Sequence, residues 1–287
     1  MKFFRLSKLG LALGLVFSLA ACSSDDGETK SKEVNLTYVE WDTEIASTHV
    51  VGQVLEDLGY DVKLTPLDNG IMWEAISKGE VDGMVSAWLP QTHAPQVKKH
   101  KDNIVDLGEN LTGAKLGMVV PSYMDVNSIE DLTTEADKTI TGIDPGANMT
   151  LATENAYKVY PNLEGWTVLT SSGSAMTAAL KKAIDNNEEI IVTGWSPHWK
   201  FNAYDLKYLD DPKGVYGDEE YIGTFARKGF KEDNPDAYSV LDNFLWTAED
   251  IESVMYDIMD GADPKAAAKK WVQENEDKVS EWTKDVK

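Results

Sequence analysis

The chain has 287 residues, with 27 Lys or Arg against 49 Asp or Glu, so its formal net charge is -22 at pH 7. This acidic balance argues against nucleic acid and anionic membrane surfaces as partners, because like charges repel. The chain has one cysteine, which excludes an intrachain disulfide and a cysteine metal cluster.

The start of the chain is typical of an export segment. Residues 1–21 combine a basic start with an apolar run and small residues, which predicts a signal peptide. The ending Leu19–Cys22 (LAAC) resembles a bacterial lipobox, so we expect lipidation of Cys22; the alternative is an ordinary signal peptide with a chance cysteine. Residues 22–33 are small, polar and charged, which predicts a flexible tether. The expected location is extracytoplasmic, lipid-anchored to the outer face of a bacterial cell membrane.

Strands and helices alternate along the rest of the chain, which favours an α/β fold with mostly parallel pairing. The expected strands of the first part are 34–41, 61–67, 81–89 and 104–107. The expected helices are 42–58, capped by Asp42 or Thr43, then 69–78 and 95–101.

A second α/β unit follows a crossing segment at 113–120. Its expected strands are 138–143, 166–170 and 189–195, and its expected helices are 148–160 and 174–186. Residues 204–217 have an irregular pattern, 222–227 are expected to cross back, and 234 onward is expected to be helical. The sequence shows no internal repeat.

The simplest architecture is therefore two α/β lobes with the chain crossing between them twice. We expect lobe one to comprise 34–114 plus 218–287 and lobe two to comprise 115–217. A cleft between lobes is a common place for a small-molecule site.

Three tryptophans stand where apolar runs meet a turn or a helix start: Trp41, Trp88 and Trp195. Ligands of open α/β sheets bind beyond the carboxyl ends of the strands. Three indole faces gathered there would suit a cation without hydrogen-bond donors, such as a quaternary ammonium. A tryptophan at a strand end is more often core packing. The other six tryptophans are expected to be structural, with Trp73 and Trp199 nearest the cleft.

Four segments carry a family resemblance: 41–47 (WDTEIAS), 86–93 (SAWLPQTH), 142–146 (GIDPG) and 194–199 (GWSPHW). They resemble glycine betaine/proline betaine-binding proteins, the extracytoplasmic receptors of osmoprotectant ABC importers, and the resemblance covers nearly all of the chain after the tether. It implies a two-lobed periplasmic-binding-protein fold, type II-like, that closes on its ligand in a cleft between the lobes. It also implies a protein that is not an enzyme and that needs no cofactor.

The resemblance also implies the site residues. The cage for the trimethylammonium group would consist of Trp41, Trp88 and Trp195. The ligand carboxylate would be held by the side chain of His93 and the backbone N–H groups of Asn148 and Met149. A helix start after the Asp-Pro-Gly turn offers free N–H groups and a positive dipole end, which supports this part on physical grounds. Proline betaine and sulfonium analogues share the same pattern of charges.

The chain has no phosphate-binding loop and no second hydrophobic span. The expected partners are therefore a membrane permease and a separate ATPase subunit, with the protein itself a monomer in contact with the membrane through its lipid anchor only. A sensory lipoprotein that binds the same ligand is an alternative.

A secreted hydrolase is a further alternative from the enzyme class. Ser171, Ser172 and Ser174 lie near glycines, but no Gly-x-Ser-x-Gly elbow is present. The four scattered histidines lack metal-site spacing, so no catalytic metal is expected.

Overall fold

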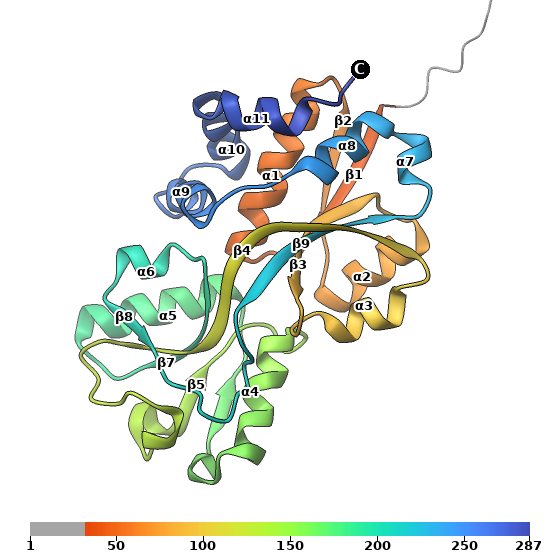
Figure 1. Cartoon of the computed structure of the whole chain (residues 1–287). Helices are drawn as coiled ribbons and strands as arrows, with labels where there is room; N and C mark the ends of the chain where they lie inside the picture. The colour runs from red at the N-terminus through yellow and green to blue at the C-terminus, as the bar shows by residue number, and fades with distance from the viewer. Residues whose placement is uncertain (1–31) are drawn as a thin grey trace, which may run out of the picture. The chain divides into compact units, whose positions relative to one another are not determined.

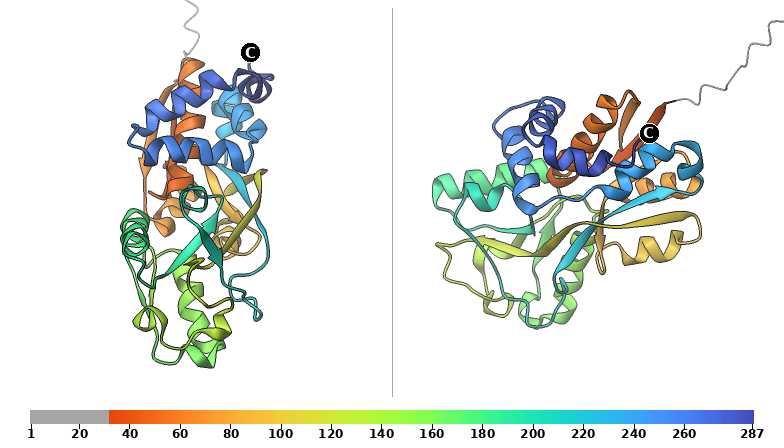
Figure 2. Two further views of the ribbon diagram at one scale, coloured as in Figure 1. Left: turned by 90° about the vertical axis from the view of Figure 1, so that its left-hand side faces the viewer. Right: turned by 45° about the horizontal axis from the view of Figure 1, so that its top comes forward.

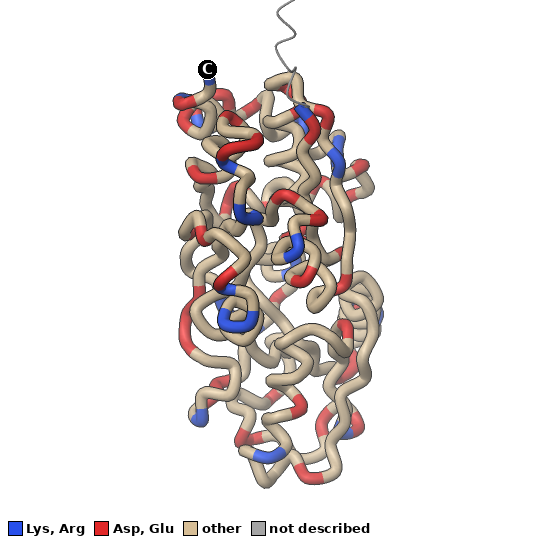
Figure 3. Tube along the Cα trace, turned by 90° about the vertical axis from the view of Figure 1, so that its right-hand side faces the viewer, with Lys and Arg blue, Asp and Glu red and all other residues tan. Residues whose placement is uncertain are grey.

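The computed structural model describes residues 32–287, and the predicted signal peptide, Cys22 and most of the predicted tether lie outside the described residues. Within 32–287, every helix is too short or too polar to cross a lipid bilayer. Figure 3 shows acidic segments spread over the described chain, with basic segments scattered among them instead of gathered in one stripe.

The first half of the sheet is a β-α-β-α-β unit. Its elements are β1 (Glu33–Tyr38), α1 (Asp42–Asp57), β2 (Asp61–Pro66), α2 (Asn69–Lys78) and β3 (Gly83–Leu89). The strands are parallel in the order β2-β1-β3. The two crossovers run in opposite directions along the sheet, and right-handed connections then place α1 and α2 on opposite faces (Figure 1). The short helix α3 (Ala94–His100) packs beside α2.

The second half repeats this path. Its elements are β5 (Thr139–Thr141), α4 (Asn148–Val159), β6 (Thr167–Leu169), α5 (Gly173–Asn186) and β7 (Ile191–Ser196). The strands are again parallel, now in the order β6-β5-β7. The same handedness rule places α4 and α5 on opposite sides (Figure 1). The two halves therefore share one topology.

Two antiparallel strands, β4 (Ile104–Pro121) and β9 (Glu220–Arg227), join the halves and lie side by side in Figure 1. The full order is β2-β1-β3-β9-β4-β7-β5-β6, with β8 (Leu206–Tyr208) paired to β4. The sheet is therefore mixed: the prediction of mostly parallel pairing is right inside each half and wrong for the crossing strands, which must run against their neighbours to pass from one half to the other.

The segments expected as two separate strands, 104–107 and 113–120, are one strand in the structure. Gly108 and Gly113 have positive φ, and the register with β9 shifts beside each of them. Bulges at these glycines let the strand bend and continue where the sequence pattern suggests a break.

The remaining helices are α6 (Lys200–Ala203), α7 (Phe230–Asp233), α8 (Pro235–Asn243), α9 (Ala248–Met259), α10 (Pro264–Glu274) and α11 (Glu276–Thr283). Three 3-10 helices complete the described elements: η1 (Ile129–Asp131), η2 (Glu135–Lys138) and η3 (Pro161–Leu163). The predicted helical end is confirmed: α8, α9 and α10 pack against α1, and α11 packs against α8 and α10 (Figure 2). The region 204–217, predicted as irregular, contains β8, which is too short for a sequence pattern to reveal.

Three tryptophans predicted to be structural lie in a core between the C-terminal helices. The rings of Trp246 and Trp271 meet edge to face at 5.8 Å, and Trp271 stacks on Trp282 at 5.6 Å. All three are at most 5% exposed. These aromatic contacts bury a large apolar area and fix the helices to one another.

Candidate functional site

Four of the predicted site residues lie at strand ends or helix starts in the two halves, and Trp88 and Trp195 hold matching positions. Trp88 and Trp195 are each the next-to-last residue of β3 and β7. Trp41 is the N-cap of α1 after β1, and Asn148 is the first residue of α4 after β5. Because both halves follow the same path, all four positions lie at carboxyl ends of strands, where open α/β sheets bind ligands.

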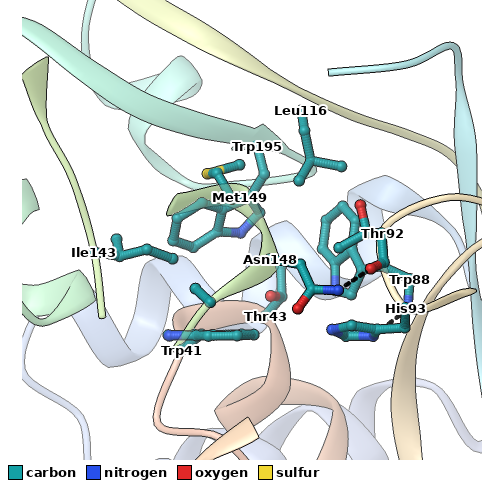
Figure 4. Close-up of a pocket in the computed structure, with 11 residues that line it drawn as sticks. Trp41, Thr43, Trp88, Thr92, His93, Leu116, Ile143, Asn148, Met149 and Trp195 are labelled. Atoms are coloured by element: carbon teal, nitrogen blue, oxygen red, sulfur yellow. Dashed lines mark hydrogen bonds between the residues drawn. The ribbon is translucent and has the colours of Figure 1, made fainter. Parts of the chain in front are cut away.

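These segments line a partly open pocket whose volume, counted out to its mouth, is about 350 Å³. Its lining consists of Trp41, Thr43, Trp88, Thr92, His93, Leu116, Ile143, Ala147, Asn148, Met149 and Trp195 (Figure 4). All six residues predicted to contact the ligand are in this set. The other five were missed because small polar and aliphatic residues carry no signal of their own. None of the eleven is Asp, Glu, Lys or Arg, so any charge placed here meets a neutral wall.

The three indoles reach the pocket from different directions, with Trp195 and Trp41 on opposite sides of it in Figure 4. They are 4–8% exposed, and the ring contacts found within residues 32–287 pair no two of them. The Nε1–H of Trp41 donates to Asp144 Oδ2 of the other half at 2.9 Å, which fixes the plane of this ring. The faces are thus held apart, with space between them.

Trp88 and His93 are tied to each other by two hydrogen bonds. The Trp88 N–H donates to His93 Nδ1 at 3.0 Å, and the His93 N–H donates to Trp88 O at 2.8 Å. A backbone N–H can only donate, so Nδ1 is the acceptor and Nε2 carries the ring proton. Nε2 is buried and has no partner within the described part of the chain. Complete burial lowers the pKa of His93 to about 3, so the ring is a neutral donor at physiological pH.

The start of α4 offers two more donors. Ala147 is the N-cap of α4. Its backbone N–H donates to Asp144 O at 3.0 Å, which closes the turn before the helix. No hydrogen bond within residues 32–287 uses the backbone N–H groups of Asn148 and Met149. Unpaired N–H groups at a helix N-terminus, with the positive end of the helix dipole, form a ready anion site.

Asp42 differs from its prediction as a possible helix cap. The N-cap of α1 is Trp41, without a side-chain cap, because the Asp42 carboxylate instead accepts from Trp199 Nε1 at 2.7 Å. Burial opposes its ionisation, but hydrogen bonds and charge from His198, Trp199 and Lys200 hold the pKa of Asp42 at about 2. Trp199, which was predicted to lie near the cleft, therefore lies at a contact between the halves but outside the pocket lining.

Trp195 packs against two buried polar side chains, His198 and Lys200. The His198 ring meets Trp195 edge to face at 4.7 Å, and Lys200 Nζ lies 4.4 Å from the Trp195 ring centroid. Lys200 also donates to Trp195 O at 3.2 Å, and burial holds the pKa of Lys200 well below its usual value. These contacts fix the third indole.

The serines that suggested a hydrolase serve local structure. Ser172 caps α5 by accepting from Ala175 N at 3.2 Å, and Ser171 Oγ donates to Gly142 O at 2.8 Å. Neither residue, nor Ser174, lines the pocket. Across residues 32–287, no group of three or more His, Cys, Asp or Glu could hold a metal ion.

Two α/β halves joined by a pair of crossing strands, with a pocket between their facing strand ends, are the architecture of a two-lobed substrate-binding protein, and the solved structures that this chain resembles are binding proteins rather than enzymes. Residues 32–274 match the family model described as the substrate-binding domain of the ABC-type glycine betaine transport system. The chain belongs to this family.

Individual relatives agree with this membership. The glycine betaine/carnitine transport binding protein GbuC of Listeria monocytogenes is 55% identical over 158 residues, and this match spans 55% of the chain and about half (53%) of that relative. Lactococcal OpuAC, in a closed-liganded crystal structure with glycine betaine, is 52% identical with a TM-score of 0.85, covering 88% of this chain and 99% of that one. ProX of Borrelia burgdorferi, a glycine betaine/L-proline-binding protein, is 35% identical with a TM-score of 0.84 over 88% and 96%.

Proposed function

We propose that this protein captures glycine betaine in the pocket between its halves. The trimethylammonium group lies among Trp41, Trp88 and Trp195. The carboxylate accepts from His93 Nε2 and from the backbone N–H groups of Asn148 and Met149. The observation that carries the proposal is the pocket itself: three indoles from both halves surround an uncharged space that has unpaired donors at one end.

The neutrality of the wall selects the ligand. Aromatic faces attract a methylated cation by roughly 0.5–2 kcal/mol per contact, more when water is excluded. A primary ammonium would bring N–H donors, and each donor left without an acceptor costs about 1–3 kcal/mol. The donors at the other end suit a carboxylate, so the zwitterion lies along its own dipole.

The fold supports closure over the ligand. For this motion we take residues 34–114 with 218–287 as one lobe and 115–217 as the other. Since Trp41, Trp88 and His93 belong to the first lobe and Trp195 and Asn148 to the second, the ligand binds best when both sides meet, which shifts the population to the closed state.

We also propose where the protein is located and which partners it has. The receptor is a monomer, held outside the cell by a lipid on Cys22, and delivers its ligand to a permease driven by a separate ATPase subunit. Proline betaine and sulfonium analogues fit the same pattern of charges. A sensory lipoprotein would bind the same ligand without importing it. Measuring glycine betaine uptake in a strain that lacks the protein distinguishes the two roles, because uptake falls only if the protein serves import.

The proposal is tested by titrating the protein with glycine betaine while tryptophan emission is recorded. We expect a saturable change, because an onium ion placed against three indoles alters their surroundings. Glycine at the same concentrations serves as the control. An emission that stays flat, together with no heat of binding for any betaine in calorimetry, would remove the proposed function.

A further inference from the structure

Two side chains beside the pocket, those of Asn148 and Asp42, reach from one half of the protein to the other. Each is the first residue of the helix that follows the central strand of its half, α4 after β5 and α1 after β1. Their partners also match in position: those of Asn148 include the turn after β3, and those of Asp42 follow β7.

The amide of Asn148 is fully used, and only by the opposite half. Its Nδ2 donates to Thr92 O and, at 3.1 Å, to Gln96 Oε1. Its Oδ1 accepts from Gln96 Nε2 at 2.9 Å and from Asn69 Nδ2 at 3.4 Å. Two donors and two lone pairs are all that a primary amide offers. This side chain therefore has its full set of hydrogen bonds only when the halves are together.

Asp42 makes the corresponding contact on the other side. Its Oδ1 accepts from Trp199 Nε1 at 2.7 Å, and its Oδ2 lies 3.5 Å from His198 Nε2. Both partners belong to the segment after β7. A hydrogen bond to a charged acceptor is stronger than one between neutral groups.

We propose that Asn148 and Asp42 are a pair of clasps that hold the two halves closed over the bound ligand and so set the rate at which the ligand leaves. The inference rests on the proposed function. In this proposal Asn148 links ligand binding to closure of the two halves. Its backbone N–H is directed to the ligand carboxylate, while its side chain holds the opposite half. The clasps break when the halves separate, so they slow release without taking part in the first encounter.

The test uses three substitutions that leave the cage intact. Asn148→Ala keeps the backbone donors and removes the amide; Gln96→Ala removes its partner outside the pocket lining; Trp199→Phe keeps a ring and removes the donor to Asp42. Binding and release of glycine betaine are followed by stopped-flow tryptophan fluorescence. We expect dissociation to be about tenfold faster in each variant, with association changed by less than about threefold.

The combinations distinguish a clasp from general loosening. Asn148→Ala with Gln96→Ala should release ligand no faster than Asn148→Ala alone, because Asn148→Ala already removes both hydrogen bonds that Gln96 makes with this side chain. Asn148→Ala with Trp199→Phe should multiply the two effects, because the contacts are separate. Gln273→Ala, on the exposed face of α10, is the matched control and should behave as the unaltered protein.

The outcomes separate this inference from the proposed function. If the unaltered protein binds glycine betaine and the three single variants release it at the same rate, the clasps are overturned and the function stands. Additive effects of Asn148→Ala and Gln96→Ala would also overturn the pairing. If the unaltered protein does not bind glycine betaine, the proposed function itself fails.

Discussion

Replacing Trp195 by Leu is expected to weaken glycine betaine binding about 30-fold or more, whereas Trp195→Phe is expected to weaken it only about threefold. Leu keeps an apolar wall but has no π cloud, and Phe keeps a smaller π cloud. Trp195 is 4% exposed and fixed by His198 and Lys200, so its face cannot be replaced by a neighbouring ring. Isothermal titration calorimetry measures both affinities.

The same pair of substitutions at Trp88 should give the same ranking, because this residue holds the matching place in β3. Tyr256→Leu is the control, since Tyr256 is an exposed aromatic on α9 outside the pocket. Thermal melting without ligand shows whether a variant is folded. Equal affinities for the Leu and Phe variants would mean that the pocket recognises apolar volume and not the π faces.

Removing the methyl groups of the ligand is expected to have a still larger effect. Glycine should bind at least about 100-fold more weakly than glycine betaine, with the mono- and dimethylated forms in between. Each lost methyl group introduces an N–H donor, and none of the eleven lining residues offers a carboxylate to accept it. Competition against the fluorescence signal of glycine betaine gives the series. A flat series would show that the onium head does not lie in the cage.

Much of the fold could be predicted because each half is built from strong local patterns. The alternation of apolar runs and helical periods located most strands and helices within a few residues. The bend in β4 could not be predicted, since Gly108 and Gly113 indicate a break in any local reading. Nor did the sequence show that the halves share a path: a common topology needs a common order of apolar segments, not similar residues.

Part of the candidate site could likewise be predicted from the sequence, and part could not. The tryptophans were found because their positions at strand ends follow from local pattern, and His93 from the resemblance. The role of the Asp42 carboxylate and the Asn148 amide could not be found, because their partners lie 50 or more residues away in the opposite half. Such contacts depend on how the halves meet, and no local pattern contains that.

A crystal structure of the protein with glycine betaine tests the proposed binding mode most directly. We expect the three methyl groups among the indoles of Trp41, Trp88 and Trp195, with the carboxylate within hydrogen-bond distance of His93 Nε2 and of the first backbone N–H groups of α4. A ligand bound outside these indoles, or bound with its carboxylate toward them, would contradict it.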